Sequence, residues 1–259
     1  MKPEEIQEIF KRIRCRQPLI HMIPNIVSAA LCADGLSALG ARPLMAVAPQ
    51  EMTEIIKQAE GVVVNLGQLT LEKRQAAGAV LKAAEKENKP VVLDPVGCGA
   101  SAFRQETVQE LLKISWKGII KGNQSEVYSI QQNILTCEGI DAIEERTLTN
   151  AVPEGKIFLV SGERDRILWQ GGICELEKKE KRSYNIVGTG CLLGAVAGAC
   201  HSVETNPIRA AKAAALGIGY GMARAKKAAG YGQAKLALLD ALEQLDKEVF
   251  LDWMKGKEK

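Results

Sequence analysis

The segment Gly188-Thr189-Gly190-Cys191 places two glycines and a thiol at the start of an unbroken run of small and apolar residues. A glycine turn that leads into a helix leaves backbone N–H groups exposed, with the positive end of the helix dipole behind them. Such a turn binds anions, phosphate above all, and glycines let a phosphoryl group approach the backbone. We therefore predict an anion hole at Thr189 and Gly190, whose field should lower the pKa of the Cys191 thiol. A glycine cap followed by a buried cysteine is the alternative on these four residues alone.

Two acidic residues and a lysine could complete a phosphoryl-transfer site. Asp94 ends an apolar run, and Mg²⁺ favours carboxylates combined with phosphate oxygens; the alternative is a turn-forming Asp-Pro. Glu126 stands three residues after Asn123, which predicts a capping box, although its carboxylate could also order the water shell of magnesium. Lys121 could meet a nucleotide phosphate as a point charge.

The elements that position these residues follow from the hydrophobic pattern. Helical spacing of apolar residues predicts helices over 69–88 and 101–114. Between such segments, continuous apolar runs predict strands that are covered on both faces. Strand, helix, strand order then predicts an α/β fold with a mainly parallel sheet. The predicted strands are 18–23, 42–47, 61–67, 89–97, 118–123 and 156–162.

The rest of the chain extends this pattern. Residues 166–176 resemble a hairpin at one sheet edge, and helices are predicted over 190–203, 206–228 and 232–250. Glycines between 216 and 230 predict close helix packing, with contact to an adenine as the alternative. We expect one domain over 1–259. Since ligands collect beyond the carboxyl ends of parallel strands, the site should form where four strands end in polar residues, at Asn65, Asp94, Lys121 and Ser161.

Composition limits the classes of partner. The net charge of +3 comes from scattered residues, so we expect neither a nucleic-acid nor a membrane partner. Seven cysteines without a CxxC pair favour neither a zinc site nor a disulfide framework. The start of the chain predicts an amphipathic helix, no signal peptide is evident, and no apolar run reaches about 18 residues. We expect a cytoplasmic protein.

Several segments, in order and with matching spacing, carry a resemblance to a known family from about residue 17 to about 225. The cysteine after Gly-Thr-Gly and the segment around Met45 are its specific parts. The sequence resembles the hydroxyethylthiazole kinases of the ribokinase-like superfamily. This resemblance implies a three-layer sandwich, with a mainly parallel central sheet and helices on both faces. The segments are PLIHMIPNIV, ALGARPLMAVAPQE, VVVNLGQLT, KPVVLDPVGCGAS, IIKGNQSE, LVSGERD and GTGCLLGAV.

The resemblance also implies an activity and roles for individual residues. The implied reaction is ATP-dependent phosphorylation of the primary alcohol of 4-methyl-5-(2-hydroxyethyl)thiazole in thiamine biosynthesis or salvage, with Mg²⁺ as cofactor. It implies a homotrimer whose thiazole pockets lie between subunits. The implied roles are catalysis for Cys191; thiazole binding for Met45, Gly188 and Asn25; ATP binding for Lys121 and Ser161; and magnesium binding for Asp94 and Glu126.

The sequence departs from the family pattern mainly in its substrate half. Pro24 removes a backbone donor, Ala30 replaces an asparagine, and Gln50 stands where an acid is usual. Lys121 replaces an arginine, which keeps the charge and loses bidentate geometry. Three rival functions therefore stay open: a kinase of another heterocyclic alcohol such as hydroxymethylpyrimidine, a repair lyase for hydrated nicotinamide cofactors, and a non-catalytic binder of thiazole or nucleotide.

Overall fold

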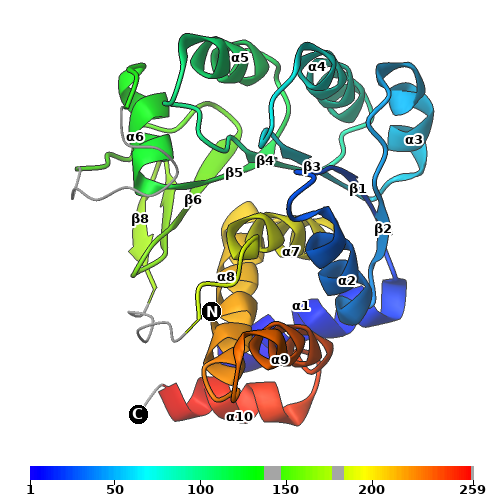
Figure 1. Cartoon of the computed structure of the whole chain (residues 1–259), viewed down its shortest axis with the longest axis vertical. Coiled ribbons are helices and arrows are strands. Elements are labelled where there is room, and N and C mark those ends of the chain that lie inside the picture. The colour runs from blue at the N-terminus through cyan, green and yellow to red at the C-terminus, as the bar shows by residue number, and fades with distance from the viewer. Residues whose placement is uncertain (137–146, 177–183, 258–259) are drawn as a thin grey trace.

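The computed structural model describes residues 1–136, 147–176 and 184–257, and its central feature is an eight-stranded sheet (Figure 1). The order is β2-β1-β3-β4-β5-β6-β7-β8, in which all pairs through β6 are parallel and the last two are antiparallel. This confirms the predicted mainly parallel sheet and the edge hairpin. The strands are β1 Leu19–Ile23, β2 Arg42–Leu44, β3 Gly61–Asn65, β4 Val91–Asp94, β5 Gly118–Asn123, β6 Lys156–Ser161, β7 Arg166–Trp169 and β8 Gly172–Glu175.

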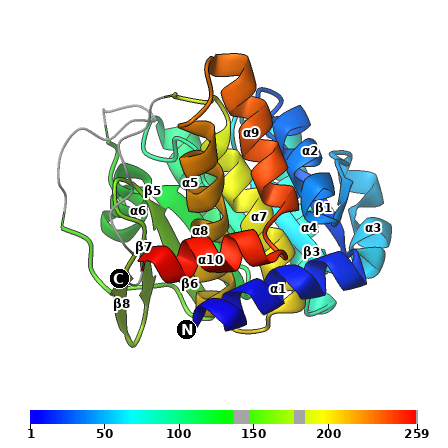
Figure 2. The ribbon, with the colours of Figure 1, turned by 90° about the horizontal axis from the view of Figure 1, so that it is seen from below.

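Helices cover both faces of the sheet, as the continuous apolar strands predicted. One layer holds α3 Met52–Gln58, α4 Leu71–Lys86, α5 Ala102–Leu112 and α6 Gln124–Gln132, with the short 3₁₀ helix η1 Pro49–Glu51 beside it. The other layer holds α1 Pro3–Arg16, α2 Ala29–Leu39, α7 Thr189–Val203 and α8 Pro207–Ala225, with α9 Tyr231–Glu243 and α10 Glu248–Lys257 outermost (Figures 1 and 2). Each face of the sheet has its own hydrophobic core, so the architecture is a three-layer sandwich.

The prediction of a single helix over 232–250 is wrong, because the chain breaks between α9 and α10. Carbonyls released at the break accept hydrogen bonds from Gln7, whose Nε2 lies 2.9 Å from the Lys247 oxygen and 3.3 Å from that of Asp246. The turn brings Phe250 against Phe10 of α1, with ring centroids 5.6 Å apart. The break thus allows this aromatic pair to be buried, and no glycine or proline marks it in the sequence.

Close helix packing at the α8 glycines is confirmed. A Cβ on Gly217 would lie 2.9 Å from Leu245 Cδ1, which leaves no room for a side chain. Gly221 meets Leu238 of α9 in the same way. These glycines let α9 and the following turn approach α8, and thereby fix the layer behind α7.

Strand register brings the polar strand ends to one edge. Asn65 pairs with Asp94 across β3 and β4, and Asn123 pairs with Ser161 across β5 and β6. Because Leu93 pairs with Ile120, Lys121 lies beside Asp94. Helix α7 starts at the same edge, where Gly194 lies against Asp94. The predicted rim site therefore forms around the carboxyl ends of β3 to β6.

Candidate functional site

A buried polar network occupies the centre of this rim. Asp94 receives a hydrogen bond from Asn65 Nδ2 at 2.8 Å on Oδ2, and Lys121 Nζ lies 3.3 Å from Oδ1. None of the three residues is more than 5% exposed. Asn65 Oδ1 in turn accepts from the Gly67 amide at 2.9 Å, so the amide orientation is fixed on both sides. The network holds one carboxylate and one ammonium at the end of β4 and β5.

Glu126 combines the two roles that the sequence left open. The capping box is present, with Asn123 Oδ1 accepting from the Glu126 amide at 2.8 Å and Glu126 Oε2 accepting from the Asn123 amide at 2.7 Å. Its other oxygen accepts from the Gly97 amide at 2.8 Å, in the loop that follows Asp94. Glu126 therefore caps α6 and also connects that helix to the loop after β4.

Burial governs the charges in the network. It raises the pKa of Asp94 to about 7, with the Glu126 carboxylate adding to the rise and Lys121 opposing it. For Lys121, burial acts to lower the pKa, but the nearby Asp94 and Glu126 carboxylates outweigh it and the pKa is raised. Lys121 therefore stays charged, whereas ionisation of the buried Asp94 costs free energy. A further positive charge near the two carboxylates would lower that cost.

The predicted glycine turn is present at the start of α7. Gly188 is the N-cap with φ of 90°, a left-handed conformation that favours glycine, and a Cβ there would lie 2.8 Å from Ser28 Cβ. The Thr189 amide donates to the Ile186 carbonyl at 3.4 Å. Among the described residues, the Gly190 and Cys191 amides have no such acceptor, so these two amides of the first turn are free to bind a ligand. A Cβ on Gly190 would lie 3.2 Å from Lys121 Nζ, so the ammonium sits directly behind this turn.

The prediction of a lowered Cys191 pKa is wrong. Burial raises the pKa of this thiol, and the Asp94 carboxylate raises it further, while hydrogen bonds from Ser28 and Asn65 oppose the shift only in part. The helix terminus supplies a favourable field, but desolvation of the thiolate outweighs it. Cys191 is therefore a neutral thiol at the mouth of the turn.

The raised pKa predicts slow alkylation of Cys191. Because iodoacetamide attacks the thiolate, the labelling rate at this residue should keep rising above pH 9.0, the ordinary value for the group. Peptide mass spectrometry after timed labelling measures the rate at Cys191 separately from the exposed Cys15. A labelling rate that reaches its plateau below pH 8 would show instead that the pKa of Cys191 is lowered.

The remaining predicted residues lie on either side of this centre. Ser161 is half-buried at the end of β6, where its Oγ lies 3.4 Å from the Gly122 carbonyl. Asn25 follows β1 and contacts Gly67, whereas Met45 follows the edge strand β2 and packs partly buried against the α7 layer. The predicted site residues thus extend along one rim from β2 to β6, with the acids and the thiol in the middle.

The sequence did not indicate three further side chains at this rim. Ser28 is buried, its Oγ donates to the Asn25 carbonyl at 3.4 Å, and its hydroxyl acts to lower the pKa of the Cys191 thiol. Lys73 and Arg104 project from α4 and α5 and bind loop carbonyls after β1, β3 and β4. None of them belongs to a recognisable motif, since their roles depend on which loops the sheet brings together.

The chemistry of the donor set bears on the implied metal. Within the described ranges, no group of three or more histidine, cysteine, aspartate or glutamate side chains could form a cage for a metal ion. Asp94 and Glu126 are close enough to influence each other electrostatically, and each carboxylate oxygen keeps a lone pair beyond the bonds described above. This set fits Mg²⁺ held largely by phosphate and water oxygens, which is how that ion is usually bound.

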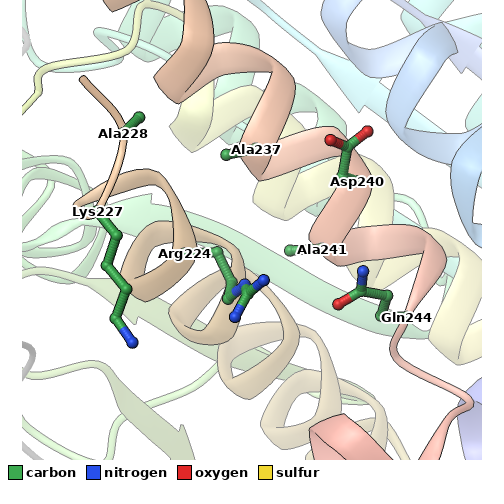
Figure 3. A pocket seen from close by; sticks show the side chains of 7 residues that line it. All are labelled: Arg224, Lys227, Ala228, Ala237, Asp240, Ala241 and Gln244. Atoms are coloured by element: carbon green, nitrogen blue, oxygen red, sulfur yellow. The ribbon is translucent and has the colours of Figure 1, made fainter. Parts of the chain in front are cut away.

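A separate hollow lies between α8 and α9 (Figure 3). It measures about 260 Å³ and is lined from the α8 side by Arg224, Lys227 and Ala228 and from the α9 side by Ala237, Asp240, Ala241 and Gln244. None of its lining residues belongs to the predicted site. In the part of the chain that the structure describes, no helix has the length and apolar character needed to span a bilayer.

Comparisons with known proteins decide the family. A model of the hydroxyethylthiazole kinase family matches residues 10–248. The chain belongs to the hydroxyethylthiazole kinase family. Hydroxyethylthiazole kinases of an Exiguobacterium species and of Syntrophus aciditrophicus are 35% and 36% identical to it, and the alignments cover 92% and 95% of this chain and 93% and 94% of the relatives.

Solved structures support the same family and fold. The structure of a hydroxyethylthiazole kinase protein from Pyrococcus horikoshii is 28% identical, with a TM-score of 0.82 and 95% of both chains covered. An ADP complex of Bacillus subtilis pyridoxal kinase is 13% identical with a TM-score of 0.58, covering 80% of this chain and 91% of the other, and shows the fold alone. Membership of the family confirms the resemblance predicted from the sequence, and the fold is ribokinase-like.

Proposed function

We propose that residues 1–259 form one kinase domain that transfers the γ-phosphoryl group of ATP to the primary alcohol of 4-methyl-5-(2-hydroxyethyl)thiazole. The observation that carries this proposal is the buried meeting of Asp94 and Lys121 behind the Gly190 turn, which combines a carboxylate, an ammonium and free amides in one place. Relatives that share about a third of the sequence carry the name of this activity. Neither of these relatives carries a name that supports a repair lyase, a hydroxymethylpyrimidine kinase or a non-catalytic binder.

The chain supplies positioning and charge for this transfer. The Gly190 and Cys191 amides face the migrating phosphoryl group, and the Lys121 ammonium behind them stabilises the same negative charge. Ser161, one strand further along the rim, is placed to contact the nucleotide. Asp94 and Glu126 would hold Mg²⁺, which when bound neutralises phosphate charge and aligns the oxygens of the nucleotide. Phosphoryl transfer has a loose transition state, so these electrostatic contributions dominate.

Cys191 orients the acceptor in this proposal and does not act as a strong base. Its raised pKa keeps the thiol protonated near neutral pH. A weakly acidic thiol can still contact the attacking hydroxyl, and the loose transition state needs little base assistance. Asn25, Met45 and Gly188 form the substrate side of the rim, where Gly188 brings the turn against the loop that carries Asn25 and Ser28.

We also propose the homotrimeric, cytoplasmic state that the resemblance implies. The substrate side of the rim bears exposed apolar residues: Ile26 is 79% exposed and Val187 61%. A neighbouring subunit that covered them would complete an apolar pocket for a thiazole ring. Sedimentation equilibrium would give the mass of three chains.

A coupled ADP-release assay tests the proposed function. Turnover of the thiazole alcohol should require Mg²⁺ and exceed that of hydroxymethylpyrimidine by at least about tenfold, since a site shaped for one alcohol discriminates by that order. Faster turnover of the pyrimidine would assign the other substrate. ATP binding by calorimetry without turnover of any alcohol would assign a binder.

A further inference from the structure

Lys73 connects two rim loops that are far apart in the sequence. It lies in the first turn of α4, and its Nζ donates to the Pro24 carbonyl at 2.7 Å and to the Gly67 carbonyl at 2.6 Å. Pro24 follows β1 and Gly67 follows β3, so the ammonium joins the loops of neighbouring strands. Among the described residues Lys73 forms no ion pair with a carboxylate, which leaves its charge to these carbonyls.

The connected loops carry a predicted substrate residue. A Cβ on Gly67 would collide with Asn25 Nδ2, so the Asn25 side chain packs directly on the glycine whose carbonyl Lys73 binds. Asn25 Oδ1 accepts from the Val27 amide at 3.1 Å, and the Ile26 amide donates to Gln68 Oε1 at 3.2 Å. The loop at 24–28 is therefore attached to the β3 loop by side chains on both sides of Asn25.

Pro24 limits how the loop at 24–28 can be held in place. Pro24 has no amide hydrogen, so the backbone at this position can be held only through its carbonyl oxygen. A charged donor makes the strongest such bond available. Lys73 supplies it from a helix that the α3/α4 layer fixes against the sheet.

Arg104 continues the connection towards the acids. Its Nη1 donates to the Leu66 carbonyl at 3.0 Å and to the Val96 carbonyl at 2.9 Å, which joins the loop after β3 to the loop after Asp94. Burial and the nearby Arg104 lower the pKa of Lys73. The loop at 24–28 meets the turn before α7, because a Cβ on Gly188 would lie 2.8 Å from Ser28 Cβ.

We propose that Lys73 is a positioning residue for the acceptor alcohol: by binding the Pro24 and Gly67 carbonyls it holds the loop at 24–28, and with it Asn25, in place beside Cys191. The inference rests on the proposed function for the identity of the alcohol. It assigns no contact between Lys73 and either substrate. The nucleotide side of the rim, at Lys121 and Ser161, has no bond to this lysine and should be independent of it.

Steady-state kinetics of Lys73→Met separate this role from a general structural one. We expect KM for the thiazole alcohol to rise about tenfold or more, since two bonds from a charged donor are lost, while KM for ATP changes less than about twofold. Lys73→Arg, which keeps charge and donors, should recover much of the alcohol affinity. Lys82→Met is the matched control, because Lys82 is exposed on the same helix, and it should match the unmodified protein.

Hydrogen exchange gives a readout that does not depend on turnover. Peptides that cover 24–28 should exchange faster in Lys73→Met, and peptides that cover the α7 turn should not. Equal increases in both KM values, or unchanged alcohol KM together with unchanged exchange at 24–28, would overturn the proposal. If the unmodified protein phosphorylates no thiazole alcohol, the proposed function fails, and calorimetric binding of the alcohol with the exchange data then decides the role of Lys73. If Lys73→Met does not fold, Lys73→Gln carries the same comparisons.

Discussion

Asp94→Asn is expected to reduce kcat by about a hundredfold or more, the order seen when a key electrostatic group is removed from a transition state. Asp94 is fully buried, and both of its oxygens accept bonds, from Asn65 and from Lys121. An asparagine offers only one acceptor oxygen, so its amide group would face either a donor of Asn65 or the Lys121 ammonium. The variant therefore loses the charge that attracts magnesium. It also sets the new amide NH₂ group against a donor of Asn65 or Lys121.

Lys121 allows the catalytic effect of this change to be separated from its effect on stability. Left without its carboxylate, the buried ammonium should lower the free energy of unfolding, by up to about 3 kcal/mol on the scale known for broken buried ion pairs. The double variant Asp94→Asn/Lys121→Met removes the unpaired charge and should recover most of that loss in a denaturant titration. Its kcat should stay low. Because the double variant lacks both groups, recovery of activity along with stability would show that Asp94 and Lys121 both serve the fold alone.

The raised pKa of Asp94 adds a pH dependence to the same experiment. Since the carboxyl has a pKa of about 7, it becomes protonated and neutral as the pH falls through that value. The kcat/KM of the unmodified protein at limiting magnesium should then decrease below about pH 7, because this ratio reports the free enzyme. An asparagine cannot titrate, so the low kcat/KM of the Asp94→Asn variant should not decrease further below pH 7. An acid limb near pH 4 in the unmodified protein would contradict the assignment.

Gly190→Ala should lower kcat by about a hundredfold without loss of stability. Gly190 is the second residue of α7 and is exposed, so an alanine suits the helix. The added Cβ would lie 3.2 Å from Lys121 Nζ, so it would crowd the ammonium that the proposed mechanism places behind the amides. Alanine keeps the amide of residue 190, so the expected cost is that of displacing the Lys121 ammonium, and loss of one electrostatic donor typically costs a hundredfold to a thousandfold in rate. Stopped assays for kcat and thermal melts for stability measure the two effects.

Gly78→Ala is the matched control for this change. Gly78 also lies inside a helix, α4, and a Cβ there would have no neighbour within 4 Å. Both alanines should keep or raise the melting temperature, since glycine is the poorer helix former. Only the Gly190 variant should lose turnover. Full activity in Gly190→Ala would place the phosphoryl group away from this turn and remove the basis of the proposed mechanism.

Local sequence patterns determined much of this protein. The continuous apolar runs predicted six parallel strands and a sheet covered on both faces, because each run is too apolar to face water on either side. The spacing of Asn123 and Glu126 predicted the capping box, and the glycines at 188 and 190 predicted the turn before α7. These features depend on backbone preferences of a few adjacent residues. For the same reason the family could be inferred from short motifs in order.

Only the tertiary structure decided the features that depend on burial and on distant neighbours. Desolvation and Asp94 raise the pKa of Cys191, although its place in the first helical turn predicted the opposite. The chain turns between α9 and α10, where Phe250 packs on Phe10 and Gln7 binds carbonyls of the turn. Lys73 acquires its partners because β1 and β3 are neighbours in the sheet. A sequence lists the groups and their local conformations, whereas burial and through-space charge arise only when remote segments pack together.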